Sequence, residues 1–359
     1  MIGGLYGLSL GNQQFTMRDI KISHSDIGIL QTWNWGWLYK DLNITNCRVA
    51  YQMLGGADNP AVGSAVFLDS SITGCRTFVA IQSPWTLLAA NQIVLEKVTL
   101  SNVGIAVMAA EKVLYPGGTI YIPAWAYGLK WSAEGVYNTQ GMFPLVLGPP
   151  ILYKGLSFYS RSKPQYGNTG IESVMSIRAM GAIGDGKADD TEAVQKAIAM
   201  AASSGNLLFV DHGVYKVTKT IYVPPGTRMV GESYPVILAA GALWGNQGDP
   251  VPVVQIGRPG ESGHFEWLDM VISTQGRAPG AKLIEWNLAA DAGSGMWDVH
   301  TRIGGWKGTD QQLANCPKSA PVSEDCMAAF MSMHITKSGS GVYIENSWFW
   351  VTMTMIHGN

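Results

Sequence analysis

The chain has 359 residues, of which 47% are apolar and only 14% are charged, against roughly 25% in an average globular protein. Its 24 basic and 26 acidic residues sum to a net charge of −2 with no long run of either sign, which argues against a nucleic-acid surface or a polybasic membrane anchor. No stretch reaches the ~18 uninterrupted apolar residues of a membrane span. We therefore expect a folded protein with a large core and no nucleic-acid or membrane partner.

The first 110 residues contain a degenerate repeat. Its anchor residues Ile22, Ile44, Ile72 and Leu100 are separated by 22, 28 and 28 positions, and each belongs to a segment with partial apolar–polar alternation. Short strands at such a period indicate a solenoid or a propeller, and a propeller blade needs ~40 residues or more. The repeat therefore predicts a parallel β-helix, in which each coil buries its inner side chains on the next coil.

The four cysteines suggest two pairs. Cys47 and Cys75 each follow their anchor by three residues, so they should stack in neighbouring coils. Strands ~4.8 Å apart permit a disulfide there, and a pair of buried thiols is an equally good interpretation. Cys316 and Cys326 flank a Pro/Ser-rich loop and are candidates for a disulfide that closes it.

The repeat stops in a Pro/Gly/Ser-rich segment at 146–168, which is typical of a linker. Residues 193–202 then have the apolar spacing of an amphipathic helix, and an Asp or Thr before them can cap its first amides. Strand-like runs follow. One helix before a series of strands fits a cap over the open end of a second β-helix.

These patterns predict an all-β protein with a single capping helix. We expect the C-terminal coils of one β-helix over 1–147, a linker over 148–170, and the cap and first coils of a second β-helix over 171–359. The first body has no cap at its start and the second no closing element, so we expect a chain truncated at both ends.

Glu345 is the best candidate for a catalytic carboxylate. It lies in an apolar, aromatic segment, where an unpaired charge would be costly. By strand alternation it shares a face with Tyr343 and opposes Ile344. The competing interpretation is an outward glutamate on a solvated face, which the residue pattern alone favours.

A second group of candidates precedes it in the chain. Asp298, His300 and Arg302 alternate, so on a strand they face one way and could line a sugar subsite, with Trp297 beside them. An internal ion pair is the alternative. Glu285 lies among apolar neighbours, where a structural carboxylate and a site residue are equally good interpretations.

Trp33, Trp35 and Trp37 also alternate, so on one strand all three would face the same side. Aromatic faces stack on the apolar faces of sugars, and this platform fits a sugar-binding subsite. Packing between the two expected β-helices is a strong rival interpretation for one or two of them. The six histidines show no metal-ligand spacing and no phosphate loop occurs, so we expect neither a metal nor a cofactor.

Several motifs together resemble a known family. The segment Gly181-Ala-Ile-Gly-Asp-Gly-Lys-Ala-Asp-Asp-Thr191 is similar to the entry of the pectate-lyase-type (pectin-lyase-like) β-helix superfamily. The motifs that narrow the resemblance are Gly11-Asn-Gln-Gln-Phe-Thr-Met17, Trp33-Asn-Trp-Gly-Trp37, Arg161-Ser-Lys-Pro-Gln-Tyr166, Gly257-Arg-Pro-Gly-Glu-Ser-Gly263, Leu283-Ile-Glu-Trp-Asn-Leu288, Gly295-Met-Trp-Asp-Val-His-Thr-Arg-Ile-Gly-Gly305 and Tyr343-Ile-Glu-Asn-Ser-Trp-Phe-Trp350. Over nearly the whole chain they resemble glycoside hydrolase family 55, the exo-β-1,3-glucanases built from two right-handed parallel β-helices side by side.

This resemblance implies an exo-acting, inverting hydrolysis of β-1,3-glucan (laminarin) that releases glucose at a cleft between the two bodies. An inverting enzyme needs a protonated carboxyl and a second group that positions water ~6.5–9.5 Å away. The resemblance implies that Glu345 belongs to the water-positioning network. Gln14 of the first body could reach across and help to position the water, and a surface amide is the competing interpretation, which the residues favour. We expect substrate-binding roles for the aromatic and polar side chains singled out above and for one more tryptophan, namely Trp33, Trp35, Trp37, Trp297, Asp298, His300, Arg302 and Trp348.

The general acid of the family is a glutamate on a later coil. Here the expected continuation is replaced by 352–359, so the general acid is not expected within the chain. A non-catalytic glucan-binding or structural β-helix is therefore the main alternative, and a pectin-active enzyme of the same superfold is a third. The family further implies an extracellular protein that acts as a monomer on a β-1,3-glucan polysaccharide or oligosaccharide.

Overall fold

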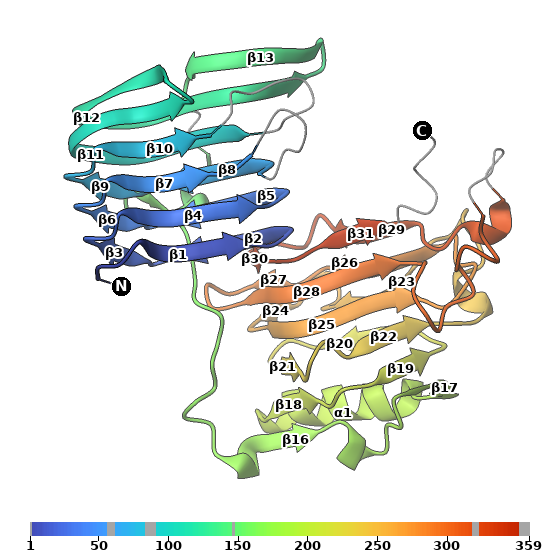
Figure 1. Ribbon diagram of the computed structural model, residues 1–359. Coiled ribbons are helices and arrows are strands. Elements are labelled where there is room, and N and C mark those ends of the chain that lie inside the picture. Colours follow the sequence, from blue (N-terminus) through green and yellow to red (C-terminus); the bar gives the residue numbers. More distant parts are fainter. Residues whose placement is uncertain (1, 56–61, 83–90, 146–147, 318–322, 352–359) are drawn as a thin grey trace. The chain divides into compact units, whose positions relative to one another are not determined.

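In a computed structural model, the chain divides into two compact units, Met1–Ser162 and Lys163–Asn359. The structure describes residues 2–55, 62–82, 91–145, 148–317 and 323–351. Each unit consists mainly of short strands stacked in layers, as the blue-to-green and yellow-to-red parts of Figure 1 show separately.

Parallel strands form three columns in the first unit. The first column contains β1 (Tyr6–Gly11), β4 (Ile27–Trp33), β7 (Val49–Met53) and β10 (Thr77–Ile81). The second contains β2 (Gln14–Arg18), β5 (Gly36–Lys40) and β8 (Ser64–Leu68), and the third contains β3 (Lys21–Ser23), β6 (Asn43–Thr45) and β9 (Ser71–Thr73). The long strand β11 (Gln92–Ala109) pairs with the last strand of every column.

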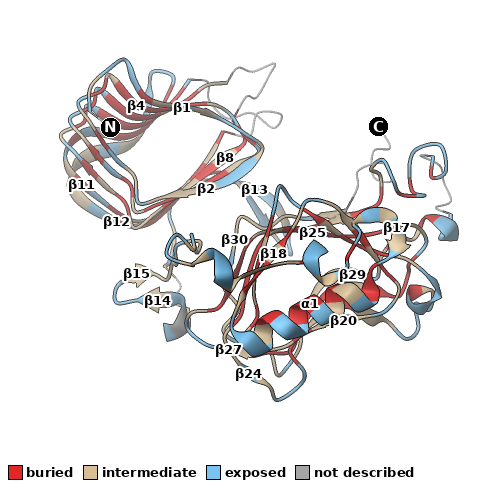
Figure 2. Cartoon of the chain, turned by 90° about the horizontal axis from the view of Figure 1, so that it is seen from below, coloured by how far each residue is buried: buried red, intermediate tan, exposed pale blue. Residues whose placement is uncertain are grey.

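The four repeat anchors stack on one another inside this unit. Ile22 is opposite Ile44, and Ile44 is opposite Ile72. Ile72 is in turn opposite Leu100, and none of the four is more than 2% exposed. The predicted stack of parallel coils is therefore confirmed for this repeat. The four side chains belong to one buried apolar cluster, and Figure 2 shows the strands of this unit in an end view, with buried residues along them.

The last strands of the first unit differ from the parallel coils expected up to residue 147. Strand β12 (Lys112–Ser132) pairs antiparallel with β11, and β13 (Gly135–Met142) pairs antiparallel with β12. The chain reverses after Ala109 through a two-residue turn in which Ala110 has φ 49°. A turn this short can join only antiparallel strands, since a parallel neighbour requires a long crossover.

The second unit also contains three main columns of parallel strands. The first contains β16 (Val174–Ser176), β18 (Leu207–Val210) and β21 (Arg228–Gly231), and the second contains β17 (Asp185–Asp189), β19 (Val214–Val217) and β22 (Val236–Ala239). Both columns continue into the long strands β25 (Glu266–Thr274) and β28 (Gly295–Ile303), and then into β30 (Ile344–Glu345) and β31 (Phe349–Val351). The third contains β20 (Ile221–Val223), β23 (Val251–Ile256), β26 (Ala281–Trp286) and β29 (Met331–Ile335).

The remaining elements are short. They are the strand pairs β14 (Tyr153–Lys154) with β15 (Ser157–Phe158) and β24 (Ser262–Gly263) with β27 (Ala289–Ala290), and the 3₁₀ turns η1 (Pro150–Leu152), η2 (Ile171–Ser173), η3 (Arg178–Met180), η4 (Ala242–Trp244) and η5 (Glu324–Cys326).

The predicted helix is present as α1 (Thr191–Ser204), one turn longer than expected. Its buried face includes Val194, Ile198 and Ala201, which join the core of the second unit. The helix contacts β18, β19 and β20 and lies across the end of this stack in Figure 2. It therefore shields the apolar interior of the first coil from water. It ends at Gly205, whose φ of 71° is a conformation that glycine adopts without a steric penalty.

The aspartates before α1 act differently from simple helix caps. Asp190 occupies the capping position, but its carboxylate accepts hydrogen bonds from the backbone N–H groups of Ile183 at 2.7 Å and Gly184 at 3.0 Å. Oδ1 of Asp189 accepts from the N–H of Thr191 at 3.0 Å. The two aspartates therefore connect the glycine-rich turn at 181–186 to the start of the helix. This connection explains why the turn and the aspartates occur together in the 181–191 motif.

The fold is thus mainly β, and the described residues contain one α-helix and two stacks of mostly parallel strands that fit a β-helix architecture. Among the described residues, no helix combines the length and the apolar character that crossing a membrane requires.

Candidate functional site

Glu345 lies on β30, beside Trp297 of β28 in the parallel register. The hydroxyl of Tyr343 donates a hydrogen bond to Oε2 of Glu345, and Ile344 between them is 36% exposed. The ring of Tyr343 lies 5.6 Å from the ring of Trp297. The carboxylate is therefore partly buried beside two aromatic rings, on the same face as Tyr343, as alternation predicts.

Asp298, His300 and Arg302 lie on one face of β28, which we call the β28 face. All three are partly exposed, while the intervening Val299 and Thr301 are buried. An ion pair does exist here, but it joins Asp298 to Lys163, with 2.7 Å between Oδ2 and Nζ. The face that the sequence predicted is therefore present, and its aspartate is paired with Lys163, the first residue of the second unit.

His300 is held between two neighbours. Its Nδ1 accepts a hydrogen bond from the backbone N–H of Trp348 at 3.0 Å, and its ring lies 5.3 Å from the ring of Tyr234. Burial lowers the pKa of His300, against the opposing charges of Asp298 and Asp269. A neutral imidazole whose Nδ1 is an acceptor carries its proton on Nε2, so His300 can donate one hydrogen bond to a sugar hydroxyl.

Aromatic side chains extend this face beyond His300. The indole rings of Trp348 and Trp350 are stacked, with centroids 4.5 Å apart and an interplanar angle of 4°. The guanidinium of Arg302 lies 4.9 Å from the ring of Trp350. Flat aromatic surfaces beside hydrogen-bond donors are the chemistry that carbohydrate binding requires.

Trp297 does not contribute a stacking surface. It is only 1% exposed, so the prediction that it binds substrate directly is wrong. It occupies the position before the bend at Asp298, whose φ is 55°, and its ring is covered by that of Tyr343. The buried indole of Trp297 therefore packs against Tyr343, the residue that contacts Glu345.

In the first unit, two of the predicted motifs pack on each other. The backbone O of Gln13 accepts from the N–H of Trp35 at 2.7 Å, and Gln14 is opposite Gly36 in the register. Gly11 lies against Trp33, since a Cβ on this glycine would be 2.6 Å from the indole. The turn that carries Gln14 thus stacks on the turn that carries Trp33 and Trp35.

The three tryptophans do not form one platform, which corrects the prediction of a shared face. Trp33 ends β4 and is 40% exposed, and Trp35 lies in the following bend and is 51% exposed. Trp37 lies on the next strand, β5, and is 5% exposed. Its indole N–H donates to the O of Asn12 at 3.0 Å. The bend at Trp35 breaks the alternation, so Trp37 points into the core and is not a sugar-stacking residue.

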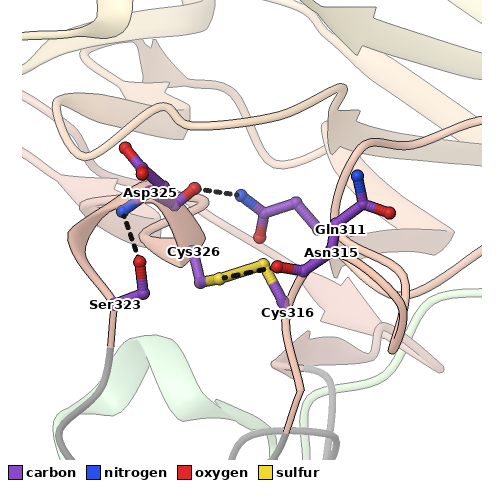
Figure 3. The surroundings of a disulfide bond; sticks show 6 residues. All are labelled: Gln311, Asn315, Cys316, Ser323, Asp325 and Cys326. Atoms are coloured by element: carbon purple, nitrogen blue, oxygen red, sulfur yellow. Dashed lines mark hydrogen bonds between the residues drawn. A yellow bond between two sulfur atoms is a disulfide. The ribbon is translucent and has the colours of Figure 1, made fainter.

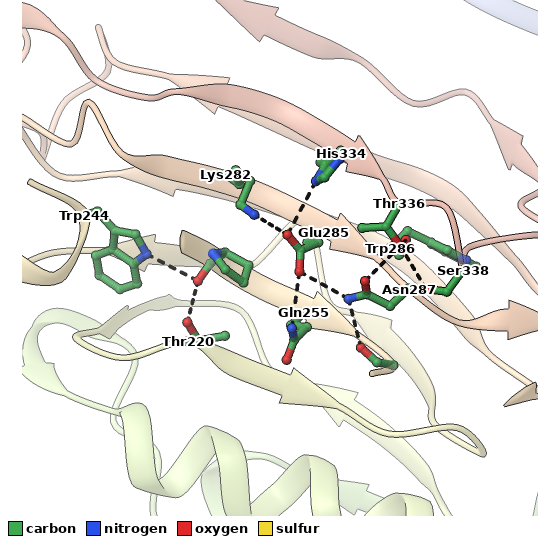
Figure 4. Close-up of polar contacts among 12 residues, drawn as sticks. Thr220, Trp244, Gln255, Lys282, Glu285, Trp286, Asn287, His334, Thr336 and Ser338 are labelled. Carbon is green, nitrogen blue, oxygen red and sulfur yellow. Dashed lines mark hydrogen bonds and ion pairs between the residues drawn. The ribbon is translucent and has the colours of Figure 1, made fainter. Parts of the chain in front are cut away.

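Glu285 lies in the third column, away from the β28 face, and is held by a polar network (Figure 4). Lys282 pairs with Oε2, and the side-chain amides of Gln255 and Asn287 donate to Oε1 at 3.3 and 3.2 Å. Burial alone would raise the pKa of Glu285, but these hydrogen bonds outweigh it and lower the pKa. The structure therefore supports the interpretation of a structural carboxylate.

Cys316 and Cys326 are joined by a disulfide across a sequence separation of 10 residues (Figure 3). Cys47 and Cys75 are buried free thiols in neighbouring coils, and the backbone N–H of Cys47 lies 3.4 Å from Sγ of Cys75. Of the two interpretations of this second pair, the structure favours buried thiols. Burial raises the pKa of Cys75 to about 11, so its thiol is unreactive at neutral pH.

Two further features bear on the chemistry. Within the described residues, no cluster of three or more His, Cys, Asp or Glu could hold a metal ion. The segment 352–359, where the resemblance expects the strand that leads to the general acid, lies outside the described residues.

Sequence reasoning missed three residues of the β28 face, namely Lys163, Tyr234 and Asp269. Asp269 occupies in β25 the position that Asp298 occupies in β28, so the repeat could have identified it. Lys163 belongs to the Arg161–Tyr166 motif, but its partners are more than 100 residues away. Tyr234 has φ 61°, and the bend that turns it toward His300 has no simple sequence signal.

The stacks of parallel coils are the architecture of a β-helix protein of the pectate-lyase type. The family described as Rhamnogalacturonase A/epimerase, pectate lyase-like matches residues 1–52 and 174–357, and the chain belongs to this family.

Similarity to individual proteins confirms the resemblance to glycoside hydrolase family 55. The chain is 49% identical over 97% of its length to a glucan 1,3-beta-glucosidase of Cochliobolus carbonum, covering 45% of that protein. It is 29% identical over 98% of its length to a probable glucan endo-1,3-beta-glucosidase of Arthroderma benhamiae, covering 52% of it. A non-secreted LysM effector of Penicillium expansum is 32% identical over 97% of the chain, which covers 29% of that protein. The chain thus spans about half the length, or less, of these relatives.

Proposed function

We propose that this protein acts on β-1,3-glucan as a glycoside hydrolase of family 55 type, releasing glucose from a chain end with inversion. The observation that carries the proposal is Glu345 itself, a partly buried carboxylate beside Tyr343 on the same sheet as the β28 face. The 49% identity to a glucan 1,3-beta-glucosidase supports β-1,3-glucan as the substrate class.

The role that we propose for each residue follows from the chemistry of its side chain. Glu345 holds a water molecule by accepting its hydrogen bond, and Tyr343 limits the orientations that the carboxylate can take. His300 and Arg302 donate hydrogen bonds to sugar hydroxyls, and Trp348 supplies an aromatic surface. Gln14, Trp33 and Trp35 of the first unit remain proposed partners in water positioning and glucan binding.

The same family resemblance supports the finer points of the proposal. We infer two right-handed parallel β-helices side by side, with coils of the first ending in the antiparallel strands β12 and β13, a linker over 148–170 and the cap and coils of the second from 171 onward. We further infer an extracellular monomer that needs no cofactor.

The direct test is to incubate the purified chain with laminarin and, separately, with polygalacturonate. Glucose from laminarin, first detected by proton NMR as the α-anomer, supports exo-acting, inverting hydrolysis. Galacturonate products would contradict the glucanase proposal in favour of a pectin-active enzyme. A Glu345→Gln variant as active as the wild type on laminarin would contradict the assignment of this residue.

The similarity to a LysM effector favours a second candidate function. Nearly the whole chain matches a protein whose name describes an effector. A glucan-binding module without catalysis would produce such a match, because a protein of this fold can retain the aromatic sugar-binding residues while lacking the catalytic residues. Tight binding of laminarin with no glucose released would support this second function, while absence of both binding and release would contradict both.

A further inference from the structure

The linker enters the second unit at Lys163, which lies between carboxylates of two neighbouring coils. Its Nζ is 2.5 Å from Oδ1 of Asp269 on β25 and 2.7 Å from Oδ2 of Asp298 on β28. Three residues later, the hydroxyl of Tyr166 donates to Oε2 of Glu266 at 2.8 Å. The segment 163–166 is therefore attached at two points to the strands that form the β28 face.

Asp269 and Asp298 occupy equivalent corners of successive coils. Leu268 is opposite Trp297 and Met270 is opposite Val299, so the two aspartates lie at the same level. Both have left-handed backbone conformations, with φ of 57° and 55°. Adjacent strands are ~4.8 Å apart, so two ionised carboxylates at these corners repel each other unless a cation lies between them.

Lys163 is that cation. Its side chain is 29% exposed, and the side chains of Asp269 and Asp298 are 23% and 18% exposed. Burial alone would lower the pKa of Lys163, but its hydrogen bonds to the two aspartates raise it. Burial raises the pKa of Asp269, and Lys163 opposes this shift. The other titratable groups that face the cluster are His300 and Tyr234.

We propose that Lys163 is a positioning residue of the glucan-binding face, because by pairing with both aspartates it offsets their mutual repulsion and holds the Asp298 carboxylate in place beside His300. This inference rests on the proposed function. It adds that a linker residue, rather than a residue of the sheet itself, sets the charge and geometry of the β28 face. Lys163 acts through Asp298 and need not contact the glucan.

The test compares Lys163→Gln and Lys163→Arg with the wild type in the binding of laminari-oligosaccharides, followed by tryptophan fluorescence at pH 7 and pH 4.5. Lys163→Gln should weaken binding about tenfold at pH 7 and clearly less at pH 4.5, because burial raises the pKa of Asp269 and its protonation in acid relieves the repulsion between the carboxylates. Lys163→Arg should stay within about threefold of the wild type, since it restores the positive charge.

Lys219→Gln is the matched control, because Lys219 also pairs with a carboxylate in this unit, Glu192, but both side chains are exposed. It should bind as the wild type does at both pH values. The inference is overturned if Lys163→Gln binds like the wild type at pH 7, if its loss is the same at both pH values, or if Lys163→Arg loses as much. A wild type that binds no glucan refutes the proposed function instead, and the inference with it.

Discussion

The hydroxyl of Tyr343 donates a hydrogen bond to Oε2 of Glu345, two residues further along the chain. Tyr343 precedes β30 and Glu345 ends it, so both side chains lie on the same side of the backbone while Ile344 points the other way. The contact restricts the rotamers of the carboxylate.

The first prediction concerns this pair. Glu345→Gln should lower the rate of glucose release from laminarin by about 100-fold or more, the usual effect of losing an essential acid–base group. Tyr343→Phe should lower it about tenfold, because a hydrogen bond to a charged group is lost while the ring remains. Tyr137→Phe, on the exposed strand β13, is the control and should leave the rate unchanged. Equal rates for Tyr343→Phe and the control would show that the hydrogen bond has no role in the reaction.

The second prediction separates the two kinds of tryptophan in the 33–37 motif. Trp37→Ala should destabilise the protein by about 3–5 kcal/mol, because it leaves a cavity in the core. Trp35→Ala should change the stability by less than about 0.5 kcal/mol and weaken laminarin binding about fivefold, because this ring is exposed. Urea unfolding and a binding titration measure the two effects. A destabilised Trp35→Ala would contradict the proposed difference.

The third prediction concerns Glu285 and pH. Its pKa is lowered in the folded protein, so the ionised carboxylate stabilises the fold above its ordinary pKa of 4.5, and this stabilisation is lost as the pH falls through the lower folded value. Glu285→Gln should cost about 3 kcal/mol at pH 7, since it leaves Lys282 without its partner in a mostly buried site.

The difference in unfolding free energy between Glu285→Gln and the wild type should shrink below about pH 4. Glu192→Gln, whose ion pair with Lys219 is exposed, should show a much smaller difference at every pH. Laminarin affinity should not change, because Glu285 is in the third column and not on the β28 face. A difference that grows toward acid pH would contradict the assigned ion pair.

The fourth prediction concerns the cysteines. A thiol reagent should find no reactive group in the native protein, two thiols after unfolding without reductant, and four after reduction. Replacing Cys316 and Cys326 together by serine should cost about 2.5 kcal/mol, as expected for a short closed loop. Four thiols in the unfolded, unreduced protein would show that the disulfide does not form.

Part of this structure follows from local sequence alone. The anchors at Ile22, Ile44 and Ile72 could be recognised because every coil must present an apolar residue at the same level, and this requirement repeats along the chain. Helix α1 could be recognised for a similar reason, since its apolar spacing matches the face it buries. Alternation also identified the shared face of Asp298, His300 and Arg302.

The tertiary structure decided the features that depend on backbone bends and on distant partners. A bend at Trp35 turns Trp37 into the core, and the turn at Ala110 replaces a parallel coil by a hairpin. Lys163 reaches Asp298 across a sequence separation of 135 residues. A two-residue period determines which side chains alternate only while the backbone stays extended, and it carries no information about which remote charge will lie beside them.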